Sequence, residues 1–345
     1  MSLCYYYYWL LTNDYTLLNA YTSSVLNALK NKKYSNSLGS GTASLYLLYL
    51  LCNESPFISP DIAMKLANSL NGISLEMLDY GNYSLFGGAA GLALGFAIHD
   101  DEFSYKAVKA FISKIESLIK GGSMFQEKRT ENNNKGCITY IGTPHGITGL
   151  LLLVLIIKQK KGLVADNLID YFVRTLMSTI VSVNGQDYFP HSLRSGVYDG
   201  DAKYLPWVCW SYGDLMSSYA ILKAGVLINN DEYYQFGLNK LVSTVKRNMN
   251  SNSNDIGLCC GLSSIPIVYK AAYSLTGNDI LSHASETWRK NASSLFEKLI
   301  SETFDTNIVP PYARNPSLYY GVPGVFLSHL FFTSNISNWT SLLLI

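Results

Sequence analysis

Apolar positions along the chain fall into two kinds of segment that alternate. In one kind, apolar residues recur at i, i+3 and i+4 opposite a polar face, which is typical of an amphipathic helix with one solvated side. In the other kind nearly every position is apolar, so the predicted helix must be buried on all sides. The amphipathic segments are residues 16–29, 61–70, 105–119, 165–180, 231–245 and 279–300, and the apolar segments include residues 45–51, 92–98, 150–157 and 325–332.

Each apolar segment follows a short repeated lead, which consists of a polar or aromatic residue, a glycine and two or three small residues. The lead occurs six times, at Gly39, Gly87, Gly146, Gly213, Gly261 and Gly321. A repeat whose period is one helix pair plus loops indicates stacked helix pairs. We therefore predict an all-α protein, an α/α toroid with two concentric rings of helices and about six to seven helix pairs. No linker interrupts the pattern, so residues 1–345 are predicted to form a single domain.

The repeated leads also predict where a functional site would lie. If the apolar helices form an inner ring, their N-termini point to one end of it, and their unpaired N–H groups make that end electropositive. Residues next to the glycines line that end, which we call the mouth. The chemically useful ones are Ser84, His145, Ser211, Tyr212, Cys259, Cys260 and Tyr319.

Composition narrows the range of partners. Charged residues make up 15% of the 345 residues, against about 25% in a typical domain, so much of the chain must be buried. The formal net charge is +1 and there is no basic tract, which argues against nucleic acid as a partner. The longest apolar run, residues 150–157, is far shorter than the roughly 20 residues of a membrane helix. We predict a cytoplasmic protein without a transmembrane segment, which could meet a membrane as part of a complex.

The cysteines offer the first candidate chemistry. Six in a chain of this length are too few for a disulfide scaffold. Cys259 and Cys260 are adjacent at the predicted first turn of an inner helix, so they are either half of a metal site or two small buried residues. A helix N-terminus favours the thiolate form. Zinc needs at least one further protein ligand, and Cys209, before another inner helix, is the natural third.

His145 and Tyr212 also lie in the repeated leads. His145 has the same repeat position as Cys260, which makes it a candidate acid or base, and the Tyr212 hydroxyl could hold a substrate or a water molecule. Two other kinds of site are disfavoured. No glycine-rich phosphate motif follows a strand, and the leads contain no pair of carboxylates such as a glycosidase needs.

The leads taken in order resemble the lanthionine synthetase C-like (LanC) family over residues 37–330. They read Ser-Leu-x-x-Gly-x-Ala-Gly, Pro-His-Gly-Ile-x-Gly, Trp-x-Tyr-Gly-Asp and Cys-x-Gly. The resemblance implies an α/α toroid with a zinc ion at one mouth. It also implies addition of peptide cysteine thiols to dehydroalanine or dehydrobutyrine, which forms thioether (lanthionine) rings in ribosomal peptides. In that family zinc holds the substrate thiol as a thiolate, and a histidine serves as acid or base.

Matched residue by residue, the resemblance assigns the acid/base role to His145 and an active-site tyrosine role to Tyr212. Cys259 corresponds to a zinc cysteine, and Cys260 to a position where the family usually has a zinc histidine and some members have cysteine. The chain departs from the family at three places. Ser211 stands where the other zinc cysteine is expected, Trp207 stands for an arginine, and Ser84 and its neighbours stand for an aspartate.

Two functions follow as hypotheses. The first is a LanC-like cyclase in which Cys259, Cys260 and Cys209 bind Zn²⁺ and His145 and Tyr212 handle the proton. The second is a catalytically impaired toroid that binds precursor peptide as a scaffold in a modification complex. Either function implies a dehydrated ribosomal precursor peptide as partner, together with a dehydratase and an exporter.

Overall fold

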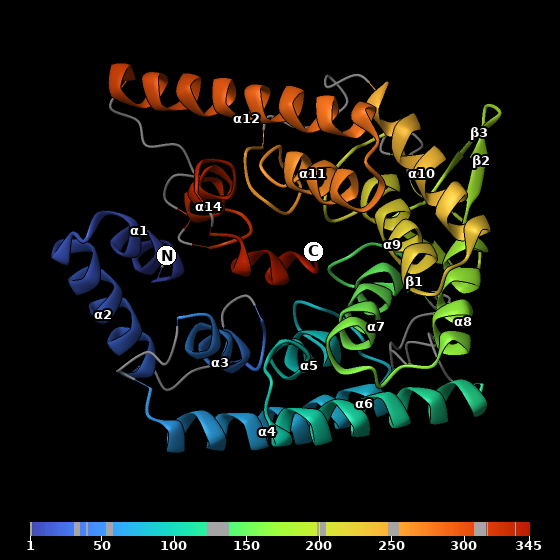
Figure 1. The fold of residues 1–345 in the computed structure, drawn as a ribbon, viewed down its shortest axis with the longest axis horizontal. Helices are drawn as coiled ribbons and strands as arrows, with labels where there is room; N and C mark the ends of the chain where they lie inside the picture. The colour runs from blue at the N-terminus through green and yellow to red at the C-terminus, as the bar shows by residue number, and fades with distance from the viewer. Residues whose placement is uncertain are drawn as a thin grey trace.

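The computed structural model describes residues 2–30, 35–38, 41–52, 58–122, 138–198, 200, 205–247, 255–306, 315, 317–334 and 336–345. Gly39, the glycine of the first repeated lead, lies outside the described residues. The described chain is mainly helical and forms two concentric rings (Figure 1). The predicted α/α toroid is confirmed. None of the helices in this part of the chain is both long and apolar enough to cross a membrane.

The inner ring consists of the apolar helices that the repeated leads introduce. In α5, α7 and α9 the first turns are fully buried, and in α14 residues 323–325 are buried while Phe326 is exposed. The inner helices that follow the leads are α3 (Thr42–Leu51), α5 (Ala89–Ile98), α7 (Ile147–Lys161), α9 (Asp214–Leu227), α11 (Ile265–Thr276) and α14 (Val322–Thr333).

The outer ring consists of amphipathic helices that follow the inner ones. Side-chain caps define where several of them begin. The Ser59, Asp101 and Asn230 side chains accept hydrogen bonds from the first turns of α4, α6 and α10. The outer helices are α2 (Tyr15–Lys30), α4 (Pro60–Asp79), α6 (Glu102–Lys120), α8 (Asp166–Met177), α10 (Asp231–Val245) and α12 (Asp279–Thr306).

The N-terminal helix α1 (Ser2–Thr12) lies between the first and last inner helices and packs against α2 and α14 (Figure 1). The Cys4 thiol donates to the Pro323 carbonyl at the start of α14 over 3.0 Å. The Tyr7 hydroxyl reaches the Leu51 carbonyl at the end of α3, 3.5 Å away. The aromatic N-terminus therefore fills the inner position that the repeated leads leave open, and in the described structure α1 and α2 form a pair of their own.

The fifth repeated lead differs from the prediction. Cys259 and Cys260 were placed on the first turn of an inner helix, and this is wrong, because α11 begins only at Ile265, with Ser264 as its N-cap and Pro266 in its first turn. Residues 257–264 form bends and turns before the helix. The two thiols are therefore carried by a loop, and no helix N-terminus begins at them.

Two short antiparallel strand pairs lie outside the helical rings. β1 (Ile138–Tyr140) pairs with β4 (Ser192–Arg194), and β2 (Val181–Val183) pairs with β3 (Gln186–Tyr188). The Ile141 N–H continues the first pair by donating to the His191 carbonyl over 2.9 Å. This pairing brings the segment around His191 beside the lead of α7.

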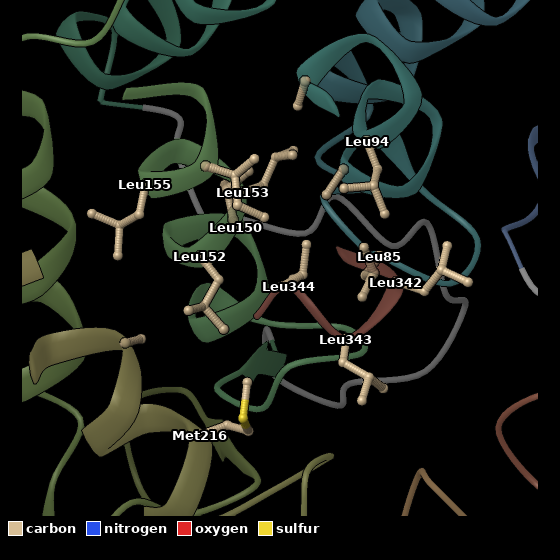
Figure 2. Packing of buried hydrophobic residues seen from close by; sticks show 14 of the residues in the cluster. Leu85, Leu94, Leu150, Leu152, Leu153, Leu155, Met216, Leu342, Leu343 and Leu344 are labelled. Atoms are coloured by element: carbon tan, nitrogen blue, oxygen red, sulfur yellow. The ribbon is translucent and has the colours of Figure 1, made fainter. Parts of the chain in front are cut away.

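The C-terminal tail, residues 336–345, occupies the centre of the ring and contains the 3₁₀ helix η3 (Asn338–Leu343) (Figure 1). Its side chains Trp339, Leu343 and Leu344 are fully buried. Figure 2 shows Leu342, Leu343 and Leu344 close to leucines of α5 and α7 and to the lead residue Leu85. No pattern in the sequence predicts that the tail fills the ring like a plug.

Candidate active site

Backbone hydrogen bonds join the loops at the mouth into one continuous series. Each of the first five loops donates an N–H group to the carbonyl of the next loop around the ring, and these bonds couple the positions of neighbouring loops. The bonds are Leu38 N to Phe86 O (2.9 Å), Leu85 N to Pro144 O (2.8 Å), Thr143 N to Ser211 O (2.8 Å), Ser211 N to Cys259 O (3.0 Å) and Cys259 N to Tyr319 O (2.9 Å).

These loops approach one another closely enough to require glycine. A Cβ atom on Gly142 would lie 2.2 Å from the Ser211 carbonyl oxygen, and one on Gly146 would lie 2.3 Å from the Tyr140 carbonyl oxygen. Gly213 has a φ of +82°, a conformation that other residues rarely adopt. Gly142 therefore permits a close contact between two mouth loops, and Gly146 and Gly213 permit tight turns within single loops.

An aromatic layer lies beneath the mouth loops. The Trp210 ring stacks on Tyr319, with centroids 5.4 Å apart, and on Phe86, 5.8 Å away. Trp210 and Tyr319 each donate to the C-terminal tail, at the Leu343 carbonyl (2.9 Å) and the Leu342 carbonyl (2.7 Å). Tyr319, predicted as a mouth residue, is therefore part of this layer, which rests on the tail.

Four side chains form a row of thiols and a hydroxyl at the mouth. The Cys259 and Cys260 sulfurs are 3.8 Å apart. The Ser211 hydroxyl lies between Cys260 Sγ (3.2 Å) and Cys209 Sγ (3.3 Å). The structure thus brings the predicted thiols of Cys259, Cys260 and Cys209 to one place, with Ser211 separating Cys209 from the other two.

Their surroundings give these thiols different acidities. The hydrogen bond that Cys259 and Cys260 share lowers the pKa of Cys260 to about 7 and raises the pKa of Cys259. Burial and the nearby Cys260 raise the pKa of Cys209 to about 11. Cys260 is therefore the thiol that ionises most readily near neutral pH.

The thiols partly fit a zinc ion. Zinc–sulfur bonds of about 2.3 Å in a tetrahedral shell place two sulfurs about 3.8 Å apart, and the Cys259–Cys260 pair has this separation. The next side chain, Ser211, offers a neutral hydroxyl, which is a weak zinc ligand beside thiolates. Among the residues that the structure describes, no three His, Cys, Asp or Glu side chains come close enough together to hold a metal ion. Cys209 as the third ligand stays a prediction.

Ser211 therefore decides the strength of any zinc site. We expect Ser211→Cys to raise the affinity for Zn²⁺ by a factor on the order of 100 or more, because it adds a thiolate next to an existing pair. Competition with a chromophoric zinc chelator measures this. Ser264→Cys, at an equally buried serine nearby, is the matched control and should leave the affinity unchanged. If both variants gain the same zinc affinity, Cys259 and Cys260 do not bind the ion together with residue 211.

His145 lies between β1 and α7, on the other side of Tyr212 from the thiols. Its Nδ1 is 2.9 Å from the Ser84 hydroxyl, which also contacts the Pro144 carbonyl at 2.9 Å. Two backbone N–H groups already donate to the Ser84 oxygen, over 3.2 and 3.3 Å, so this contact holds the ring in place without fixing which ring nitrogen carries the proton. Because Ser84 engages Nδ1, Nε2 is the ring nitrogen left to meet a substrate. His145 is exposed to the mouth, but partial desolvation by its neighbours lowers its pKa, so the neutral ring predominates near neutral pH and can act as a base.

Tyr212 separates two cavities at the mouth. One, of about 670 Å³, is lined by His145, Ser84, Tyr140 and Tyr212. The other, of about 410 Å³, contains the thiols of Cys209 and Cys260 and is also lined by Tyr212. Burial and the nearby Cys259 thiol raise the pKa of Tyr212, so it is a neutral phenol that can donate a hydrogen bond. A substrate held across Tyr212 would reach both the thiols and the histidine.

Two further mouth residues were missed from the sequence. The His191 ring lies edge-on to Tyr212, with centroids 5.2 Å apart, and the Tyr320 side chain lies close enough to Cys259 to act on its pKa. His191 arrives through the pairing of β1 with β4, which leaves no local signal in the sequence. Tyr320 follows Tyr319 directly, so its exposed position in a repeated lead was the available clue.

Comparison with known proteins agrees with this architecture. The family model described as lanthionine synthetase C-like protein matches residues 1–344. The solved structure of nisin cyclase superimposes with a TM-score of 0.74 at 16% sequence identity, over 95% of this chain and 85% of that one. No curated protein matches the sequence. The structural likeness shows the fold, a helical toroid, and the family match covers the mouth as well as both rings. The chain belongs to the lanthionine synthetase C-like family.

Proposed function

We propose that this protein is a lanthipeptide cyclase, which adds a peptide cysteine thiol to dehydroalanine or dehydrobutyrine and so forms a thioether ring. The observation that carries the proposal is the arrangement at the mouth. Thiols that can bind a metal ion lie on one side of Tyr212, and a neutral histidine whose Nδ1 is held by Ser84 lies on the other.

The reaction needs little from the protein except orientation and proton transfer. The substrate sulfur bonds to the β-carbon of the dehydro residue, and the electron pair of the carbon–carbon double bond moves toward the carbonyl to give an enolate. The proton lost from the thiol returns at the α-carbon, so no oxidant, reductant or leaving group is required. His145 Nε2 would move this proton, and the Tyr212 phenol would donate a hydrogen bond to the enolate oxygen.

Zinc belongs to the same proposal. Cys259 and Cys260 would hold it with Cys209 as third ligand, and when bound it would keep the incoming thiol ionised. The partners we propose are a dehydrated ribosomal precursor peptide, a dehydratase and an exporter, with the cyclase in the cytoplasm.

Removing the imidazole tests the proposal. We expect His145→Ala to slow thiol loss from a dehydrated precursor peptide by about 10²- to 10⁴-fold, the usual contribution of a positioned acid or base. Free thiols are counted by alkylation and mass spectrometry. His283→Ala, at an exposed histidine on α12, is the control and should retain the full rate. Equal rates in wild type and His145→Ala would refute the assigned role.

The scaffold function has its own supporting observations. Ser211 replaces a thiol ligand, and no acidic side chain lines the His145 cavity among the described residues. A scaffold would bind the dehydrated peptide tightly and leave its thiols unconsumed. The same experiment separates the two functions, since binding without thiol loss favours the scaffold.

A further inference from the structure

The smaller mouth cavity, about 410 Å³, has a lining of an unusual kind for a peptide site. Apart from the thiols and His191 it is built from aromatic and aliphatic side chains, and the described residues that line it include no Asp, Glu, Lys or Arg. We call it the Trp207 pocket. Its lining includes Phe189, His191, Tyr198, Leu205, Trp207, Cys209, Tyr212 and Cys260.

The walls of this pocket are held in place by buried contacts. The Phe189 N–H donates to the buried Asp214 carboxylate over 2.6 Å. The Cys209 thiol donates to the Tyr212 carbonyl over 3.4 Å. Phe189, Leu205 and Cys209 are at most 3% exposed, so they cannot turn outward to open or close the space. The part of the wall that these three residues form is therefore fixed, and its shape can help to select a ligand.

The lining decides which ligand chemistry it accepts. A charged side chain entering the pocket would lose its hydration and find no ionic partner among the described lining residues, which is costly. An apolar side chain would leave water for an aromatic surface, and an aromatic ring could add edge-to-face contacts with Trp207 and Tyr198. The cavity is large enough for a phenylalanine or leucine side chain, which leaves room for neighbouring backbone.

The pocket lies next to the place where the substrate cysteine would bind. Cys260, one of the two paired thiols, lines its wall. Successive Cα atoms of a peptide are about 3.8 Å apart, so a substrate cysteine at the paired thiols puts its neighbour within reach of the pocket. We infer that the Trp207 pocket binds an apolar side chain next to the reacting cysteine, so that the preferred substrates carry Phe, Leu or a similar residue beside that cysteine. This inference rests on the proposed function.

Short peptides of sequence Gly-X-Cys-Gly, with X as Phe, Leu, Ala, Asp or Lys, test the inference by calorimetric titration under reducing conditions. We expect the Phe and Leu peptides to bind about 10- to 100-fold more tightly than the Ala peptide, as burial of a large apolar side chain predicts. The Asp and Lys peptides should bind more weakly than the Ala peptide. In Trp207→Ala and in Tyr198→Ala the preference for Phe should shrink, whereas Trp9→Ala, at a half-buried tryptophan on α1, should keep it.

The outcomes separate this inference from the proposed function. Equal binding of all five peptides, or a Phe preference that survives in both pocket variants, overturns the Trp207 pocket. A second series, Gly-X-Ser-Gly, tests whether the thiol of the peptide is recognised. If the serine peptides bind as tightly as the cysteine peptides, thiol recognition is contradicted, but the preference for an apolar X is not. If no peptide binds in either series, both the pocket and thiol recognition are overturned.

Discussion

Deletion of the C-terminal tail, residues 336–345, is expected to abolish or nearly abolish the stability of the toroid. The tail buries Trp339, Leu342, Leu343 and Leu344 in the ring. Each large apolar side chain contributes about 1.5–3 kcal/mol on burial, and the total stability of a native protein is only about 5–15 kcal/mol. Urea unfolding followed by circular dichroism measures the loss. If the truncated protein and the wild type unfold at the same midpoint urea concentration, the tail does not stabilise the ring.

A milder variant keeps this prediction testable if the truncated chain does not fold. Leu343→Ala should lower the free energy of unfolding by about 2–5 kcal/mol, because it leaves a cavity inside the ring. Leu10→Ala, at a leucine on α1 that is 44% exposed, should change it by about 0.5 kcal/mol or less. A synthetic peptide with the sequence of residues 336–345 should bind a folded truncated protein and restore its stability.

The tail also supports the site. Trp210 and Tyr319 donate hydrogen bonds to carbonyls of the tail. Trp210 directly precedes Ser211 in the chain, and the Tyr319 carbonyl accepts the N–H of Cys259. Shortening the tail should therefore raise the reactivity of the Cys259 and Cys260 thiols toward an alkylating reagent before the ring unfolds.

Asp214→Ala is expected to lower the free energy of unfolding by about 3–5 kcal/mol, the usual cost of removing one partner of a buried ion pair. The Asp214 side chain is fully buried. It accepts the Phe189 N–H over 2.6 Å, pairs with Arg247 and lies 3.9 Å from Lys240. Without the carboxylate, Arg247, whose side chain is 14% exposed, would remain charged in a mostly buried position. Thermal and urea unfolding measure the loss.

A surface ion pair provides the matched control for Asp214. Asp166, whose side chain is 62% exposed, is 2.8 Å from Lys158, and Asp166→Ala should cost only about 0–1 kcal/mol. The double variant Asp214→Leu/Arg247→Met should recover part of the loss, because it removes both charges. If Asp214→Ala and Asp166→Ala lower the free energy of unfolding equally, the buried ion pair does not contribute more stability than a surface pair. Asp214→Ala should also weaken the peptide preference of the Trp207 pocket, because Phe189 loses its support.

The outer helices follow closely from local sequence. The amphipathic pattern at 231–245 matches α10, and the pattern at 105–119 matches α6 to within a few residues. The pattern at 61–70 stops too early, since α4 continues to Asp79. Asn71 and Gly72 read as a turn, but a Cβ on Gly72 would meet nothing within 4 Å, so an exposed helical surface tolerates the glycine there.

Most members of the candidate site could be predicted from the sequence, but His191, Tyr320 and the geometry of the site could not. The repeated leads predicted that His145, Tyr212, Cys259 and Cys260 would meet at one mouth, because equivalent positions in a ring face the same end. Whether those thiols were on a helix depended on Ser264 and Pro266, which delay the start of α11. The place of Ser211 between two sulfurs depended on backbone bonds between loops far apart in the chain.

The sequence by itself determined the helices, their burial and the ring, because each follows from a period of about 3.6 residues or from a repeat that the chain carries along its length. Only the tertiary structure decided that α1 completes the inner ring, that the tail fills its centre and that His191 reaches Tyr212. These contacts join residues far apart in the chain, such as Cys4 with Pro323 and Trp210 with Leu343. A single hydrogen bond or buried leucine between distant segments imposes no period on either segment, so it leaves no pattern to read.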